Sequence, residues 1–243
     1  MAIQKDNNKT SSLLDTLLWF LFLVLGLPFI SGLIIFLSGF FGLFLDDIST
    51  FEELDTNLGF NASISIVSIV LLLLSLKYAL PPNNQKSIYS RLALKPLVFI
   101  KLIPILLVVF TYSVLECSLF YLGIIETPVF IIDFMAQIDS VMKVVLLFFV
   151  VGIIGPIFEE IVFRGFLFYK LKHVSLNPAL IIVITSIFFT LIHNQYENIE
   201  VLCLIFISSC LLGGIRQLTG NLWYSILGHI VMNFTALIFD FLS

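Results

Sequence analysis

Two adjacent carboxylates and an arginine lie inside a segment that is otherwise almost wholly apolar, G-P-I-F-E-E-I-V-F-R-G-F-L-F-Y at residues 155–169. Glu160 and Arg164 are four residues apart, so on a helix their side chains can pair on one face. Glu159 points about 100° away from Glu160, because an α-helix has 3.6 residues per turn, and it lies over Phe163 instead. Ionisable groups are costly in apolar segments and usually mark function there. We therefore predict that Arg164 neutralises Glu160, while Glu159 acts as a general base.

The backbone around the two carboxylates carries its own signal. Pro156 follows Gly155, and this pair favours either the first turn of a helix or a kink within a longer one. Either arrangement leaves backbone N–H groups near the carboxylates, and these favour negative charge.

Two of the three histidines also lie in apolar segments. His193 ends F-F-T-L-I-H, and His229 lies in L-G-H-I-V-M-N, four residues before Asn233 on the same helical face. Counted at 1.5 Å per residue from the same end of their spans, Glu159, His193 and Asn233 lie about 18–22 Å deep. His229 lies only about 12 Å deep by the same count and fits least well. We nevertheless expect the four groups to converge on one site.

A carboxylate, two imidazoles and a carboxamide in a mostly dry cavity suit hydrolysis. The sequence has no H-E-x-x-H helix, no G-x-S-x-G turn and no G-x-G-D segment, so it lacks the patterns of zincin, serine and aspartyl proteases. Two alternatives remain. The polar residues could join helices by hydrogen bonds, or they could carry protons in a small transporter.

The composition indicates a polytopic membrane protein. The chain has 243 residues, of which 60% are hydrophobic and only 12% charged, and its mean hydropathy is +1.13. We expect an all-α bundle of seven transmembrane spans, or eight if the overlong first span holds a second element. The expected spans are 13–45, 61–80, 97–125, 141–171, 178–193, 201–215 and 222–242.

The charged connections alternate in sign along the chain. Basic groups mark the N-terminus and residues 77–101 and 164–172, whereas acidic groups mark residues 46–55 and 126–139. The positive-inside rule then predicts a cytoplasmic N-terminus. No basic patch or glycine-rich phosphate loop is present, so nucleic acid is not an expected partner.

Three short motifs occur in a fixed order: E-E-I-V-F-R at 159–164, F-T-L-I-H at 189–193 and H-I-V-M-N at 229–233. With the T-G-N-L-W-Y lead-in before His229, they resemble the CPBP family, which contains type II CAAX prenyl proteases and bacteriocin-processing and immunity (Abi) proteins. The resemblance covers about residues 141–241. It divides the chain into a motif-free part, 1–140, and a catalytic core of four transmembrane helices, 141–243.

The resemblance implies an intramembrane endopeptidase. In the family pattern Glu159 activates water together with His193, and His229 and Asn233 stabilise the oxyanion. Glu160 and Arg164 orient and neutralise the site. The family is often called a metalloprotease, and Glu159, His193 and His229 could supply three protein ligands to one zinc ion. We favour catalysis by glutamate without a metal, because each residue already has a role.

The resemblance leaves several substrates open. Family members cleave prenylated CAAX proteins, process peptides or confer bacteriocin immunity. The short loops favour a bacterial member in the plasma membrane, and hence a membrane-associated peptide or protein substrate. The alternative from another class is a non-catalytic membrane immunity or interaction protein, or a small proton-coupled transporter.

Overall fold

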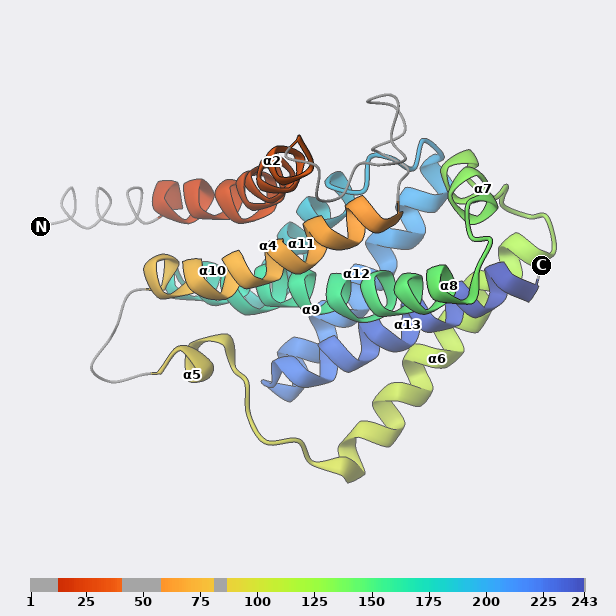
Figure 1. The fold of residues 1–243 in the computed structure, drawn as a ribbon. Coiled ribbons are helices and arrows are strands. Elements are labelled where there is room, and N and C mark those ends of the chain that lie inside the picture. The colour runs from red at the N-terminus through yellow and green to blue at the C-terminus, as the bar shows by residue number, and fades with distance from the viewer. Residues whose placement is uncertain (1–12, 41–57, 81–86, 243) are drawn as a thin grey trace, which may run out of the picture.

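The computed structural model describes residues 13–40, 58–80 and 87–242, and every regular element within them is helical. Figure 1 shows long helices gathered into one bundle, with the short helix α7 (Val129–Ala136) near one end and α5 (Ile88–Leu92) near another edge. The expected all-α class is confirmed for the described residues.

The first two long helices form a hairpin-like pair. Residues 13–21 are helical and continue through the π-helical segment η1 (Phe22–Gly26) into α2 (Leu27–Phe40). The helix α4 (Leu58–Ala79) packs against α2, and the hydroxyl of Ser68 donates to that of Ser31 at 2.9 Å. Hydroxyl contacts of this kind join helices where the surroundings are apolar.

One long helix carries both carboxylates and runs without a break from residue 141 to 173. Along the chain, this helix consists of the segments α8 (Val141–Phe149), η2 (Val150–Ile154), α9 (Gly155–Glu160), η3 (Ile161–Leu167) and α10 (Phe168–His173). Two π-helical segments therefore flank the turn that holds the carboxylates. π-Helical segments are rare in proteins, and those that occur are often found at functional sites.

Four more helices complete the bundle on the C-terminal side of α5. They are α6 (Phe99–Tyr121), α11 (Pro178–Leu191), α12 (Ile199–Thr219) and α13 (Leu222–Leu242). The helix α13 packs against both α6 and α9, while α11 packs against α12. This arrangement brings the three motif-bearing segments together.

Six helices in the described part of the chain are long and apolar enough to cross a membrane. They correspond to six of the seven expected spans, so a multi-pass integral membrane protein is supported. The remaining expected span, 178–193, is present as α11, which has 14 residues. At about 21 Å it is shorter than the roughly 30 Å hydrocarbon core. Residues 41–45 of the overlong first span, and with them any eighth element, lie outside the described residues.

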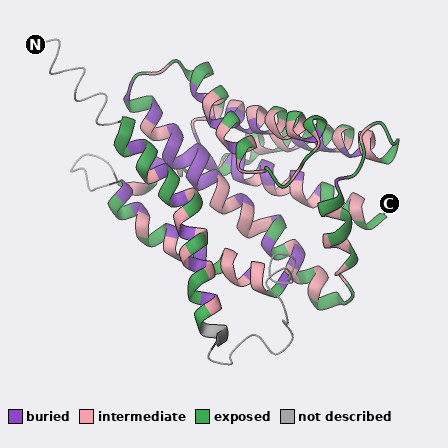
Figure 2. Ribbon diagram, turned by 90° about the horizontal axis from the view of Figure 1, so that it is seen from above, coloured by how far each residue is buried: buried purple, intermediate pink, exposed green. Residues whose placement is uncertain are grey.

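The bundle has a packed interior and an apolar exterior. Figure 2 shows buried residues along the inward faces of the helices and exposed residues along the outer faces. The exposed set includes large apolar side chains such as Leu25, Phe29 and Val108. An apolar outer surface of this kind suits contact with lipid.

Candidate active site

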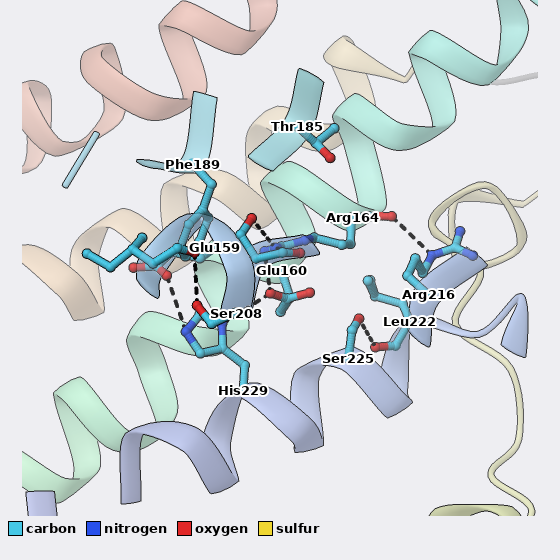
Figure 3. A network of polar contacts seen from close by, with 12 residues as sticks. Glu159, Glu160, Arg164, Thr185, Phe189, Ser208, Arg216, Leu222, Ser225 and His229 are labelled. Carbon is cyan, nitrogen blue, oxygen red and sulfur yellow. Dashed lines mark hydrogen bonds and ion pairs between the residues drawn. The ribbon is translucent and has the colours of Figure 1, made fainter. Parts of the chain in front are cut away.

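Glu160 and Arg164 form a fully buried ion pair, as their spacing predicted. The Arg164 Nη1 donates to Glu160 Oε1 at 2.6 Å, and both side chains have 0% exposure (Figure 3). The same guanidinium donates through Nη2 to the carbonyl oxygen of Ser209 at 2.8 Å and to its hydroxyl at 2.7 Å. Its central carbon lies 4.8 Å from the ring centroid of Phe189. Arg164 therefore ties the carboxylate helix to α12 and α11.

His229 connects the two carboxylates. Its Nδ1 lies 3.1 Å from Glu160 Oε1, and its Nε2 lies 3.7 Å from Glu159 Oε2 (Figure 3). An ionised carboxylate only accepts hydrogen bonds, so we assign a proton to Nδ1. The result is a chain of charged and polar groups, Arg164–Glu160–His229–Glu159. Within it, Nε2 is the nitrogen of His229 that faces the exposed end.

The depth estimate had placed His229 too shallow. Upright helices were assumed in that count, whereas α13 lies obliquely to the carboxylate helix in Figure 1. The contact between α13 and α9 falls where Glu160 meets His229. On helices that cross obliquely, residues at different distances along their own helices can still meet, as Glu160 and His229 do here.

The adjacent carboxylates differ sharply in exposure. The Glu159 side chain is 24% exposed, whereas that of Glu160 is fully buried. Glu159 has one partner in the described contacts, the Nε2 of His229. Of the two carboxylates, it is the one that solvent can reach.

His193 lies just beyond the last residue of α11. Its backbone N–H donates to Thr190 O at 3.0 Å, and its ring Nδ1 lies 2.7 Å from the carbonyl oxygen of Phe189. A carbonyl only accepts, so we assign the proton of His193 to Nδ1, and Nε2 is left as a base. Among the described contacts, no hydrogen bond or ion pair joins His193 to Glu159.

The ring of Phe189 holds both imidazoles in place. Its centroid lies 4.6 Å from that of His193 and 5.8 Å from that of His229, and Phe163 packs against it at 5.2 Å. Phe189 is 4% exposed. The sequence pattern identified it only as the residue four positions before His193. Its contact with three motif segments depends on the tertiary packing.

Asn233 lies one turn after His229 and contacts the backbone of the carboxylate helix. Its Nδ2 donates to Val151 O at 2.8 Å. That carbonyl has no helical donor for a local reason. The N–H of Gly155 bonds to Val150 O in the π-helical pattern, and the next donor in that pattern would be Pro156, which has no N–H. One hydrogen of the Asn233 amide therefore completes the helix, and the second is available for another acceptor.

Tyr196 is a residue of the site that the sequence motifs did not indicate. Its ring lies parallel to that of His193, with centroids 6.3 Å apart and an interplanar angle of 12°, and it meets Phe130 of α7 edge-on at 6.0 Å. Burial raises the pKa of Tyr196 to about 12, and the negative charges of Glu159 and Asp240 add to that rise. The phenol therefore remains a proton donor at physiological pH, close to the exposed carboxylate.

The donor set does not fit the zinc site that the resemblance allowed. A catalytic zinc ion needs about three protein ligands around one point at about 2.0–2.2 Å. Across residues 13–40, 58–80 and 87–242, no three His, Cys, Asp or Glu side chains are grouped so that they could hold a metal ion. The set Glu159, His193 and His229 is thus not assembled for a metal, and no step below uses one.

The comparisons with known proteins agree with the motifs. Residues 141–235 match the family model described as type II CAAX prenyl endopeptidase Rce1-like. Neither the curated proteins nor the solved structures gave a match. The matched segment runs from the start of the carboxylate helix to two residues past Asn233, so it contains all six predicted site residues. Residues 141–235 of the chain are therefore similar to the Rce1-like type II CAAX prenyl endopeptidases.

Proposed function

We propose that the chain is an intramembrane endopeptidase that hydrolyses a peptide bond in a membrane-associated peptide or CAAX-like protein. The observation that carries the proposal is the connected series Arg164–Glu160–His229–Glu159, in which one carboxylate is buried and paired with an arginine and the other is partly exposed. A purely structural ion pair would need only the first two residues.

In the proposed reaction, Glu159 is the general base. It takes a proton from a water molecule as that water attacks the scissile carbonyl carbon. The imidazole of His193, whose Nε2 is unprotonated, orients this water and assists its deprotonation. The proton then passes to the leaving amine as the carbon–nitrogen bond breaks.

His229 and Asn233 are the proposed oxyanion donors. Glu160 accepts from the Nδ1–H of His229 and orients the ring, and when both ring nitrogens carry a proton Nε2 donates as well. The second amide hydrogen of Asn233 provides another donor on the same face of α13. Donors fixed before the reaction stabilise developing charge without reorganisation, and removal of one typically costs about 10²- to 10³-fold in rate. Arg164 keeps Glu160 ionised throughout.

The substrate proposed here is a membrane-associated chain. Tyr196 borders the exposed end of the site. The negative charges of Asp240 and Glu116 contribute to the raised pKa of its hydroxyl. The matched family model describes CAAX prenyl endopeptidases, so a C-terminal CAAX-like peptide is the first substrate to test. The N-terminus is proposed to be cytoplasmic, from the distribution of basic residues.

The test is cleavage by the purified full chain in proteoliposomes, followed by mass spectrometry. Prenylated CAAX peptides and unmodified membrane-tethered peptides serve as separate probes. Glu159→Gln should lower the rate at least about 100-fold, because a general base contributes 10²- to 10⁴-fold, while the protein still elutes as a folded species. Glu200→Gln, at the exposed start of α12, is the matched control and should cleave normally. Cleavage by Glu159→Gln at near wild-type rate would exclude the mechanism.

A further inference from the structure

Among the described residues, Arg216 is a buried cation that forms no ion pair. Its side chain lies near the end of α12, and the residue is only 8% exposed. Nε donates to the carbonyl oxygen of Arg164 at 3.1 Å, and the guanidinium lies 5.4 Å from the ring centroid of Phe168. In the described part of the chain, its terminal nitrogens Nη1 and Nη2 make no hydrogen bond and no ion pair.

An unpaired guanidinium at this place is costly. A buried charge without a partner destabilises a protein, and charged groups in membrane spans normally pair or line a functional site. Neither Nη1 nor Nη2 of Arg216 is among the side-chain atoms of the described residues that are both completely buried and without a hydrogen-bond partner. Figure 3 shows the Arg216 guanidinium directed away from Glu160, toward the yellow segment of the chain that contains α5. The terminal nitrogens therefore point out of the catalytic network.

Two further cations lie at the same end of the bundle. Lys95 is held by Asn221, whose Oδ1 accepts from the Lys95 N–H at 3.3 Å and whose Nδ2 donates to the Lys95 carbonyl at 3.1 Å. The Lys95 Nζ lies 3.5 Å from the position that a Cβ on Gly220 would take; Gly220 follows the last residue of α12 as its C-cap, with φ +60°. Arg91, on α5, is 7% exposed.

Contacts between chain segments bring the residues that carry these cations close together. The N–H of Leu222 donates to Ala93 O at 2.9 Å, so the segment after α5 is attached to the turn between α12 and α13. Leu92 packs beside Gly165, whose preceding carbonyl, that of Arg164, accepts from Arg216. These contacts bring the segments that carry Arg91, Lys95 and Arg216 to one junction of α5, η3 and the end of α12.

We propose that this junction binds a phosphate-bearing anion, supplied either by the headgroup of an anionic phospholipid or by free phosphate. A planar guanidinium with two unused terminal nitrogens matches phosphate through paired hydrogen bonds. Arg216 lies three residues before Thr219, the last residue of α12, which is about 5 Å along the axis. That depth is near the headgroup region, where basic pockets between transmembrane helices bind lipid phosphates. The anion supplies the charge that Arg216 lacks.

The experiment measures the apparent unfolding temperature of the full chain in detergent after delipidation. Three separate additions are compared: phosphatidylglycerol, phosphatidylcholine and inorganic phosphate. Phosphatidylglycerol should raise the wild-type temperature by about 3 °C or more, since a ligand that binds only the folded state stabilises it. Phosphatidylcholine should produce no comparable rise. A rise with inorganic phosphate alone supports the site and identifies free phosphate as sufficient, whereas a rise with the anionic lipid only identifies the headgroup.

Variants distinguish anion binding at this junction from a general stabilisation of the protein by lipid. Arg216→Gln should abolish the rise, and Lys95→Gln, which changes an exposed side chain, should weaken it by at least half. Lys101→Gln removes another exposed cation at the start of α6 and should respond like wild type. If Arg216→Gln does not fold, the comparison of Lys95→Gln with Lys101→Gln decides. Equal responses to all three additions, or equal responses of these two lysine variants, would overturn the proposal.

Discussion

Glu159 and Glu160 are neighbours in sequence but lie in different surroundings. Glu160 accepts from Arg164 and lies against the Nδ1–H of His229, so its removal strands a guanidinium and an imidazole in a dry interior. Glu159 is partly exposed, and its one partner among the described residues is Nε2 of His229, at a longer 3.7 Å. Loss of Glu159 therefore removes a reactive group, whereas loss of Glu160 removes a supporting one.

These environments predict opposite phenotypes for two alanine variants. Glu159→Ala should be inactive with unchanged or raised thermal stability. Glu160→Ala should be inactive mainly through lower yield and stability, because breaking a buried pair typically costs about 3–5 kcal/mol. Apparent unfolding temperature and detergent-extracted yield, measured beside the cleavage rate, distinguish the two.

A double variant provides the control. Glu160→Ala combined with Arg164→Leu removes both charges, and it should recover yield better than either single change, although it remains inactive. A Glu160→Ala protein as stable as wild type, or a Glu159→Ala protein that fails to fold, would contradict this assignment of roles.

Tyr196 gives a second test at this scale. Because its pKa is raised to about 12, the phenol does not ionise between pH 6 and pH 10, and its hydroxyl can donate throughout that range. Tyr196→Phe keeps the stacking on His193 but loses this donor, so the cleavage rate should fall about fivefold, as expected for one hydrogen bond of about 1 kcal/mol. The pH–rate profile should keep its shape. Tyr196→Ala also loses the ring and should fall further; a Phe variant indistinguishable from wild type would show that the hydroxyl has no role.

Residue spacing predicted part of this site and missed the rest for definite reasons. The Glu160–Arg164 pair depends on one helical turn, so sequence spacing was sufficient. The Glu160–His229 contact joins residues 69 positions apart and depends on how α13 crosses α9. Ser209 belongs to none of the three motifs and Phe189 is only the first residue of F-T-L-I-H; the contacts that both make with Arg164 depend on the tertiary packing.

At the scale of elements, the π-helical segments explain how Pro156 lies inside a continuous helix. The sequence predicted either the first turn of a helix or a kink in a longer one at this proline. In the structure Pro156 lies in the first turn of α9, within one helix that continues from the segment η2 (Val150–Ile154). Local propensity does not distinguish an α-helical turn from a π-helical one, so the π-helical segment was not predictable. The unpaired Val151 carbonyl that results is what Asn233 binds.

This arrangement predicts a rescue experiment. Asn233→Ala should lower stability by about 1–3 kcal/mol, because it leaves a backbone carbonyl unpaired, and should lower the rate about 100-fold if the amide also stabilises the oxyanion. Adding Pro156→Ala restores an N–H near Val151 O, so the double variant should regain stability but not activity. Unfolding temperature and cleavage rate are measured on the same samples. Regained activity in the double variant would reduce Asn233 to a structural role.

At the scale of the whole molecule, the motif-free N-terminal part forms one side of the same core. Phe20, from the first helix, packs edge-on against Phe163 at 5.4 Å, and Phe163 in turn supports Phe189. Leu72 and Leu76 of α4 belong to the same buried cluster. The division into residues 1–140 and 141–243 therefore follows the motifs, while the hydrophobic core extends across it.

Packing across this division predicts the behaviour of a truncated chain. Residues 141–243 alone would expose the face that packs against Phe20 and α4, and would lose the contact between α6 and α13. We expect this fragment to accumulate poorly and to lack activity, although it contains every predicted catalytic residue, because Phe163 and α13 lose the supports that position Phe189 and His229. Co-expression with residues 1–140 should restore a protease-resistant complex and part of the cleavage activity. A fragment 141–243 that is folded and fully active by itself would show instead that the N-terminal helices serve a purpose other than supporting the site.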